Sequence, residues 1–575
     1  MRRTVWMSVL AASVALLLMI PQAALAAAAP PFDRFTYTSN MHPVGFSERE
    51  NTEVPFTANS DLAFWGKTAY QGNYDGFRII DITEPDNPVE LNDYRQCAGD
   101  QGDVLVWRNL LVRSWNSPAS PTATCDGKLV GSGFEGLHIF DVSDPADPHL
   151  VGSVPLKATL PNKVTVDPPS PAAGEYQASG AAFGPPPPDE GISGDIVLVN
   201  DGVGTTTNGC EPFSLPSGAV ALVDRGTCTF VQKVHNAQNA GASAVIVANN
   251  VAGQPITMGG TDPTITIASV MVSLDDGTTI KGGLPATGTV AHDPTVPPGN
   301  CGSHTATLVP DVAHGRLLVY NSASDGNCPG IDIVQIPLND PGSASFLHRV
   351  PAGRPCHDTG VILGDVLKAA CAGGNGFTVF SMDPADGGSL DTPVALYSKQ
   401  VPGVTIGHSA AFTWDGKVIV FGHEPGGGSQ ARCQPTSSDV DKTLFFFDTK
   451  TGAPLGEFVN PRPQTATENC TWHNYNVVPT ANRYVLVAAQ YQGGISVVDF
   501  TDPANAKEIA SADPAPLSDT QLILGGDWSD YWYNGRIYES DITRGLLTWR
   551  LSDQAVAKAR QLGHLNPQTQ EFTIG

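Results

Sequence analysis

Charged residues are scarce in this chain of 575 residues, where Asp, Glu, Lys and Arg make up 15%, against about 25% in an average soluble domain. Basic residues are the scarcest of these, because 32 Lys and Arg stand against 57 Asp and Glu, and the formal net charge is −25. Nucleic-acid binding depends on a basic surface that neutralises phosphates. The charge balance therefore predicts no nucleic-acid partner.

The sequence also lacks the short motifs of several enzyme classes. It has no Gly-x-Ser-x-Gly nucleophile turn, no subtilisin-like Gly-Thr-Ser turn, no phosphate-binding glycine loop, no dinucleotide fingerprint and no EF-hand loop. An HExxH zinc site needs two histidines one helical turn apart on a helix. His423 and Glu424 begin such a motif, but Pro425 and a run of glycines follow them and cannot form that helix. These absences favour a protein that is not an enzyme.

Glycine and proline are abundant by contrast, with 60 and 47 residues. Both disfavour helix interiors, which argues against a helical bundle or a coiled coil. Hydrophobic residues make up 41% of the chain, enough to bury cores and too many for global disorder.

The N-terminus has the pattern of a secretory signal. Arg2 and Arg3 are followed by an apolar run over 9–20 and by small residues at 24–26. Residues 1–26 are therefore predicted to be a signal peptide, and the mature chain to be secreted, extracellular or associated with the cell wall. No second apolar run of about 18 residues follows, so we expect no membrane span after cleavage. The alternative is an N-terminal membrane anchor, although the apolar run is shorter than the ~20 residues that a span needs.

One strand-like pattern recurs along the chain: a glycine, an apolar run that ends at Asp or an equivalent, and a turn with Pro. The clearest copies are 76–85, 136–145 and 494–503, and looser copies start at Gly330, Gly376, Thr443 and Gly545. Each copy predicts a β-strand followed by an Asx or Pro turn, with another short strand before it. The copies are regularly spaced, except between the second and the third, and the spacing suits blades of a propeller.

Seven four-stranded blades would close into a ring that leaves no free sheet edge. The alternatives are an array of β-sandwiches or an open solenoid. The copies resemble the LVIVD-repeat family over most of 55–160 and 297–555. The resemblance implies a mainly β fold, a seven-bladed β-propeller, and we expect a strand near Phe35–Ser39 to complete the last blade.

Residues 165–296 interrupt the repeats and lie between two proline-rich stretches. A strand that ends at Asp224 is followed by a turn and by a helix with Thr229 as its predicted N-cap. This stretch resembles the protease-associated (PA) domain, a small α/β module, and the matching residues include Asp224, Arg225, Gly226, Phe230, Lys233, Asn236 and Gly241. The resemblance implies a module that binds peptides or proteins, or covers an active site, and supplies no catalytic residue. These seven residues are therefore expected to be structural.

All ten cysteines follow the leader, and none forms a Cys-x-x-Cys pair. An even number in an exported chain favours disulfides, with metal ligation as the alternative. The PA resemblance places Cys210 and Cys228 in one module, where they would pair. The propeller map gives the most local solution for the others, Cys97–Cys125, Cys301–Cys328, Cys356–Cys371 and Cys433–Cys470.

Several blades have a histidine or an aspartate at a comparable position near the start of their first strand. Because the first strand of a blade lines the central channel, we expect a ring at one mouth made of Asp61, Asp100, His304, His357, His408, His473 and Asp530. Imidazoles and carboxylates that converge on an axis suit a divalent transition metal, which would polarise a substrate or activate water. The alternative, which the sequence favours, is that each side chain bonds to the backbone or to a neighbouring blade.

The sequence thus predicts six segments: a signal peptide (1–26), an N-terminal segment that would complete the last blade (27–54), blades one and two (55–164), the PA domain (165–296), blades three to seven (297–555) and a C-terminal tail (556–575). The predicted function is that of a secreted, non-catalytic binding or scaffold protein. It would recognise an extracellular protein, peptide or glycan through the PA domain and a propeller face. The alternative is a metal-dependent propeller hydrolase or oxidoreductase that uses the axial ring, and a divalent metal there is the only cofactor that the sequence suggests.

Overall fold

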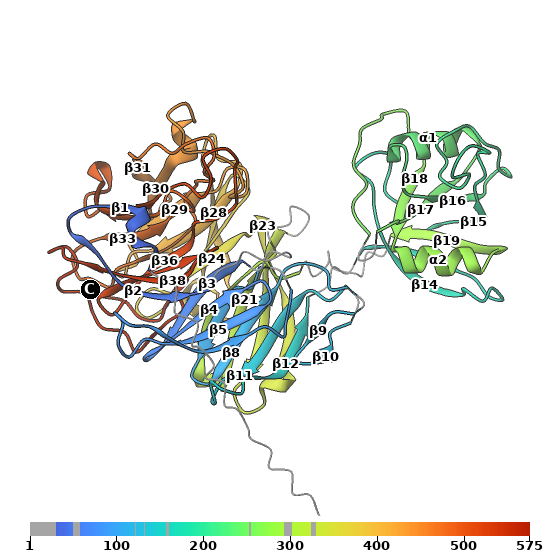
Figure 1. Ribbon diagram of the computed structural model, residues 1–575. Coiled ribbons are helices and arrows are strands. Elements are labelled where there is room, and N and C mark those ends of the chain that lie inside the picture. Colours follow the sequence, from blue (N-terminus) through green and yellow to red (C-terminus); the bar gives the residue numbers. More distant parts are fainter. Residues whose placement is uncertain are drawn as a thin grey trace, which may run out of the picture.

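The computed structural model describes residues 30–49, 58–99, 101–120, 122–131, 133–156, 160–251, 255–292, 302–323 and 329–574. The predicted signal peptide, Asp100 and the predicted Cys301–Cys328 pair lie outside these residues. The described chain is mostly β-strand and forms two bodies, a large one and a smaller one coloured green in Figure 1. Among the described residues, no helix is both long and apolar enough to cross a bilayer.

Strands of the large body form four-stranded antiparallel meanders in which each strand pairs with the next. The first meander contains β3 (Asn59–Trp65), β4 (Thr68–Asn73), β5 (Gly76–Asp81) and β6 (Val89–Tyr94). The second contains β7 (Val104–Trp107), β8 (Leu110–Trp115), β11 (Gly136–Asp141) and β12 (His149–Pro155). A small hairpin of β9 (Thr124–Cys125) and β10 (Lys128–Leu129) lies between β8 and β11 in the sequence. The third contains β20 (Thr305–Asp311), β21 (Arg316–Ser322), β22 (Pro329–Pro337) and β23 (Ser345–Pro355).

The C-terminal half continues the same arrangement. The fourth meander contains β24 (Asp358–Ile362), β25 (Lys368–Gly373), β26 (Gly376–Ser381) and β27 (Val394–Gln400), and the fifth contains β28 (Gly407–Phe412), β29 (Val418–His423), β30 (Thr443–Asp448) and β31 (Pro454–Val459). The sixth contains β32 (Asn474–Val477), β33 (Val485–Ala489), β34 (Ile495–Asp499) and β35 (Lys507–Pro514). The seventh contains β36 (Asp527–Tyr533), β37 (Arg536–Asp541), β38 (Gly545–Leu551) and, from the N-terminus, β2 (Met41–Glu48). Short 3-10 helices lie between strands at Val312–His314, Pro341–Ser343, Pro384–Asp386, Asp439–Lys442 and Pro503–Asn505.

The innermost strand of each meander contacts the innermost strand of the next. This series runs through β3, β7, β20, β24, β28, β32 and β36 and returns to β3. We interpret the closed series as the seven predicted blades around one channel. Apolar side chains of adjacent meanders meet face to face, as where Leu137 and Val154 of the second pack with Leu308 and Val334 of the third. The core is thus divided among the spaces between blades.

The repeated sequence pattern is the third strand of its meander, seen in β5, β11, β22, β26, β30, β34 and β38. Its glycine lies where the fourth strand comes closest, since a Cβ atom on Gly76 would lie 1.7 Å from the Tyr94 carbonyl oxygen. Its aspartate closes the following turn, because Asp81 Oδ1 accepts the Thr83 N–H at 2.7 Å. Backbone geometry therefore explains both ends of the repeat.

The strand expected near Phe35–Ser39 does not complete the last blade. The 3-10 helix η1 (Pro31–Arg34) leads into β1 (Phe35–Tyr37), and β1 pairs with β35 as an additional strand of the sixth meander. The next strand, β2, pairs with β38 instead. The eight residues of β2 can cover the open edge of the seven-residue β38, whereas β1 has three residues and is too short to do so.

The C-terminal tail crosses the ends of several inner strands. Its strand β39 (His564–Leu565) pairs with β3, and β40 (Thr569–Gln570) pairs with β24 in parallel. Between them, Asn566 exchanges two hydrogen bonds with the backbone of Val106 in β7, and Gln570 of β40 itself donates to the Phe412 carbonyl at the end of β28. Thr569 also donates to the Leu308 carbonyl of β20, so the tail joins at least five blades toward the end of the channel where their inner strands finish.

The smaller body is a closed barrel with the strand order β13-β14-β18-β17-β16-β15-β19. Its elements are β13 (Asn162–Val166), β14 (Gly174–Ser179), β15 (Ile192–Leu198), β16 (Val220–Asp224), α1 (Phe230–Asn239), β17 (Ala244–Ala248), β18 (Ala268–Val272), α2 (Leu274–Gly282) and β19 (Ala286–His292). Strands β15 to β18 are parallel to one another, and the other pairs are antiparallel. The Thr229 hydroxyl caps α1 by accepting the Gln232 N–H, as the sequence predicts.

Candidate functional site

Four histidines surround a cavity of about 480 Å³ at the end of the channel where the inner strands begin. His304, His357 and His473 each directly precede an inner strand, β20, β24 and β32, and His408 is the second residue of β28. Because these strands start side by side around the axis, their entry residues meet at the same level. The C-terminal tail lies at the other ends of the strands.

The histidine rings form a continuous row. Ring centroids are 4.5 Å apart for His304 and His357, 4.1 Å for His357 and His408, and 4.3 Å for His408 and His473. The Nε2 atoms of His304 and His357 face each other at 3.1 Å. The two ends of the row are attached to other blades, because His304 contacts Asn116 and His473 bonds to the Trp528 carbonyl.

A glutamate completes this cluster. Glu424 Oε2 lies 3.8 Å from His357 Nε2 and 3.9 Å from His408 Nε2, and its Oε1 lies 3.7 Å from His473 Nε2. The Tyr491 hydroxyl donates a hydrogen bond to Glu424 Oε1 at 2.6 Å. In the sequence this glutamate stands out only as part of an incomplete HExxH motif.

The signal that would have found Glu424 is its place beside His408. Strand β29 ends at His423, which pairs with Gly407 in β28, so the residue after β29 returns to the level of the histidines. The Glu424 N–H then bonds to the Ile406 carbonyl at 2.9 Å and holds the backbone there. The sequence alone does not give the register between β28 and β29, so it could not place Glu424 beside the histidines.

Burial controls the charge of the cluster. It lowers the pKa of His357 and His408 well below the ordinary value, helped by the neighbouring histidines, and lowers the pKa of His473 to about 3. Burial also raises the pKa of Glu424 to about 7, although the Tyr491 hydrogen bond opposes this. At neutral pH these three imidazoles are therefore uncharged, which is the form that binds metals.

The predicted seven-membered ring is not one ring, because Asp61 lies deeper in the channel. Asp61 is the third residue of β3 and accepts hydrogen bonds from the Tyr531 hydroxyl at 2.6 Å and from Gln568 of the tail at 3.0 Å. Burial raises its pKa and that of the neighbouring Asp103. Asp61 therefore lies with Asp103 in a group of buried carboxyl groups near the C-terminal tail.

Asp530 also lies apart from the histidines. Asp530 pairs with Glu539 of the neighbouring strand β37. Cross-strand partners point to the same face of a sheet, so the Asp530 side chain lies beside Glu539 within the seventh meander. Carboxylate oxygens of Asp527, Asp530 and Glu539 lie within 4.8 Å of one another, and all three side chains are buried. The structure thus brings together four of the predicted ring residues, separates Asp61 and Asp530 from them, and adds Glu424.

In the inserted barrel, the side chains singled out by the sequence hold its loops. The buried Lys233 ammonium donates to the carbonyl oxygens of Asn208 and Gly226, both at 2.6 Å, and burial lowers its pKa to about 8. Asn236 donates to the carbonyls of Gly209 and Cys210. These bonds tie the loop before β16 to helix α1.

The turn after β16 is held in the same way. Asp224 accepts hydrogen bonds from Thr207 at 2.6 Å and Lys281 at 2.8 Å. Arg225 donates to the Asn249 side chain at 2.8 Å, and its guanidinium lies 5.7 Å from the centre of the Phe230 ring. Gly226 and Gly241 have φ values of 124° and 90°, which favour glycine. We therefore assign these residues a structural role.

Four disulfides cross-link the described residues: Cys97–Cys125, Cys210–Cys228, Cys356–Cys371 and Cys433–Cys470. All four were among the predicted pairs. Disulfides persist in oxidising compartments, which suits a protein outside the cytosol.

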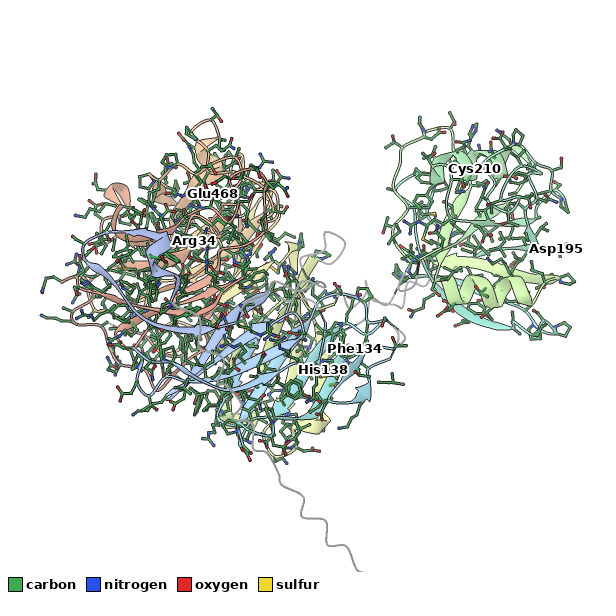
Figure 2. All side chains as sticks on the ribbon, viewed as in Figure 1. Arg34, Phe134, His138, Asp195, Cys210 and Glu468 are labelled. Carbon is green, nitrogen blue, oxygen red and sulfur yellow. A yellow bond between two sulfur atoms is a disulfide. The ribbon has the colours of Figure 1, made fainter. Side chains whose placement is uncertain are left out.

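The barrel carries a shallow groove of about 430 Å³. Its walls are Ser193, Gly194 and Asp195 of β15, the segment 216–219, and Thr287 of β19 with the neighbouring Asp167. Figure 2 shows Asp195 at the edge of the barrel and Cys210 near helix α1.

Comparison with known families identifies two modules in the chain. Residues 192–280 match the PA domain, and residues 130–155 match the LVIVD repeat. The second range contains β11, which is a third strand of a meander. The protein is therefore mainly β, with LVIVD-type propeller strands and a PA domain.

Relatives share only part of this chain. An aminopeptidase of Pseudomonas aeruginosa is 31% identical over 172 residues, which cover 27% of this chain and 30% of that protein. Vacuolar-sorting receptor 1 of Pisum sativum is 35% identical over 106 residues, 17% of this chain and 16% of that protein. The chain thus spans less than a third of either protein. A solved structure, the β-propeller domain of Cps50 (Swd1) from Myceliophteria thermophila, is 8% identical with a TM-score of 0.37, covering 88% of this chain and all of that one.

Proposed function

We propose that this chain is an extracellular recognition protein that binds a protein or peptide through its PA domain, with the propeller as scaffold and second binding surface. The PA-domain match carries this proposal, and the proteins that this chain partly matches include one named as a vacuolar-sorting receptor and one named as an extracellular protease. The motif residues of the domain are occupied in holding its loops. The disulfides and the predicted signal peptide support an extracellular location.

The groove on the barrel is the surface that we propose for the ligand. Its volume of about 430 Å³ can accept a few side chains of a peptide. Gly218 lines it, and an added Cβ there would meet no atom within 4 Å, so a bound chain can approach the backbone closely at this point. The carboxylates of Asp167 and Asp195 favour a ligand with a basic side chain or a free amino terminus.

Peptide selection tests this proposal. A phage-displayed peptide library would be panned on the full chain, and the enriched peptides measured against Asp195→Lys, which reverses the charge of the groove. We expect at least ~10-fold weaker binding, since the like charges across the contact then repel. Asp147→Lys, at an exposed turn of the second meander, is the matched control and should bind as the unchanged chain does. Undiminished binding to a chain that lacks residues 162–292 would contradict the proposal.

A second candidate function is metal-dependent chemistry in the propeller channel. The cluster of His357, His408, His473 and Glu424 beside a cavity of about 480 Å³ is the observation that favours it. A metal ion there would leave room for a small ligand on the cavity side. Metal binding is the first requirement of this function and can be tested separately from peptide binding.

A further inference from the structure

We propose that His357, His408 and Glu424 bind a divalent transition-metal ion at the mouth of the propeller channel, and that Zn²⁺ suits the site best. His304 and His473 lie on either side of these three residues and offer further imidazole nitrogens. The site is independent of the PA domain and needs only side chains of the third to sixth meanders.

The spacing of the donor atoms supports metal binding. One nitrogen of His357, one nitrogen of His408 and one oxygen of Glu424 all lie within 4.8 Å of one another. The two nitrogen–oxygen separations, 3.8 and 3.9 Å, are too long for hydrogen bonds. Around a zinc ion with bonds of about 2.0–2.1 Å, neighbouring ligand atoms would be roughly 3.3–3.4 Å apart. Each of the two nitrogen–oxygen pairs would therefore need to close by roughly 0.5 Å around one ion.

The hydrogen bonds around His408 leave its Nε2 free to bind the ion. Its Nδ1 bonds to the Ser409 hydroxyl, and that hydroxyl donates to the His473 carbonyl oxygen at 3.3 Å. With the hydroxyl proton directed to that carbonyl, His408 Nδ1 is the donor to the serine oxygen. The proton of the neutral ring is then on Nδ1, and the lone pair on Nε2 faces Glu424.

The same reasoning applies to His473. Its Nδ1 bonds to the Trp528 carbonyl, which can only accept, so the ring proton is on Nδ1. Its Nε2 therefore also carries a lone pair and lies 3.7 Å from Glu424 Oε1. A histidine fixed through Nδ1 to a carbonyl or hydroxyl is the usual outer arrangement of a metal ligand.

His357 has one ring nitrogen without a hydrogen-bond partner and a second one that faces His304. Its Nδ1 is buried without a hydrogen-bond partner among the described residues, and its Nε2 faces His304 Nε2 at 3.1 Å. Two neutral imidazole nitrogens at this distance can share only one proton. An ion that takes the lone pair of His357 Nε2 would also face the buried Glu424 carboxylate, whose Oε2 lies 3.8 Å from that nitrogen.

The chemistry of the donors selects the class of ion. Imidazole nitrogens with one carboxylate suit Zn²⁺, Cu²⁺ and related ions, whereas Ca²⁺ and Mg²⁺ prefer oxygen ligands alone. Two histidines and one glutamate that open onto a cavity are a ligand set of zinc sites with a free coordination position.

Metal analysis of the full chain tests the proposal. Chelator-stripped protein would be dialysed against Zn²⁺ and its metal content measured by mass spectrometry, and we expect about one tightly bound ion per chain. Glu424→Gln and His408→Ala should each weaken zinc binding by at least ~100-fold, because the first replaces the carboxylate by a neutral amide and the second removes an imidazole. His149→Ala, at an exposed position of β12, is the matched control and should bind zinc normally.

A spectroscopic measurement keeps the test independent of how the variants fold. Unchanged protein loaded with Cu²⁺ should show hyperfine coupling to at least two imidazole nitrogens in its paramagnetic resonance spectrum. Coupling to no nitrogen, or folded protein that binds neither Zn²⁺, Co²⁺ nor Cu²⁺, would overturn the proposal. The same holds if folded Glu424→Gln binds zinc as tightly as the unchanged chain. Peptide binding by the PA domain would be unaffected by any of these results.

Discussion

At the scale of single residues, the buried carboxyl groups of the seventh meander show how the fold changes ionisation. Burial, together with repulsion from Asp541, raises the pKa of Glu539 to about 7, and burial next to Glu539 raises the pKa of Asp527 well above its ordinary value. Glu539 accepts one hydrogen bond, from the Trp549 ring at 2.6 Å. The cluster therefore retains protons at pH values where an exposed carboxyl has lost them.

We predict that Glu539→Gln stabilises the protein at high pH. The raised pKa means that the folded state binds more protons than the unfolded state between about pH 4.5 and 7, so the free energy of unfolding falls over this range and stays low above it. Glutamine does not ionise and can still accept from Trp549. The variant should be more stable by ~1–3 kcal/mol at about pH 8 and nearly unchanged at about pH 4.

Denaturant unfolding at both pH values, with chelator present, measures this difference. Glu457→Gln is the control, because Glu457 is exposed on β31 and its loss should change little. A pH dependence in Glu539→Gln equal to that of the unchanged chain would show that Glu539 does not carry the effect.

We predict that Gly76→Ala destabilises the first meander. The added Cβ would lie 1.7 Å from the Tyr94 carbonyl oxygen, so β5 or β6 must move. Such overpacking costs about 1–3 kcal/mol in the free energy of unfolding. Gly563→Ala is the control, since no atom lies within 4 Å of its added Cβ, and it should change stability by less than ~0.5 kcal/mol. Thermal unfolding of both variants compares them, and equal melting temperatures would refute the steric explanation of the repeat glycine.

At the scale of elements, much of the strand plan follows from the sequence. The recurring glycine, apolar run and aspartate predict third strands such as β5, β11 and β34, because each feature serves a local backbone contact or turn. Helix α1 was predictable from its N-cap for the same reason. The sequence did not predict that β2, and not β1, would complete the last blade. Their partners, β38 and β35, lie far away in the sequence.

We predict that β2 contributes much more to stability than β1. A mature chain that starts at Thr38 lacks η1 and β1, whereas one that starts at Arg49 also lacks β2 and exposes the edge of β38. Because Met41 is fully buried, the second truncation should cost at least ~2–5 kcal/mol more than the first. Thermal unfolding and aggregation of the two chains would be compared. Equal stability would mean that β2 does not close the ring.

At the scale of the whole molecule, the propeller and the PA barrel have separate cores. The barrel core is formed by residues of β13 to β19 and the helix α2, and none of its members comes from the propeller strands. The propeller has its own closures, namely β2 at one edge and the C-terminal tail across at least five inner strands. Two bodies of this kind should unfold independently.

We predict that two variants each shift one unfolding transition. Replacing both Cys210 and Cys228 by serine removes the disulfide of the barrel and should lower its transition by about 3 kcal/mol, the value for a loop of this length. Ending the chain at Gly563 removes β39 and β40 and should lower only the propeller transition. Calorimetry of the full chain resolves the transitions. A single transition that both variants lower equally would show that the bodies unfold together.

The sequence by itself determined the fold class, the PA domain, the disulfide partners among the described residues and the four histidines at the blade entries. All of these depend on short windows in which a turn, a cap or a close backbone approach requires particular residues. The tertiary structure decided that Glu424 joins the histidines and that Asp61 and Asp530 do not. Convergence on the channel depends on strand register and on the level that each residue reaches along the axis, and both are set by pairings between distant segments.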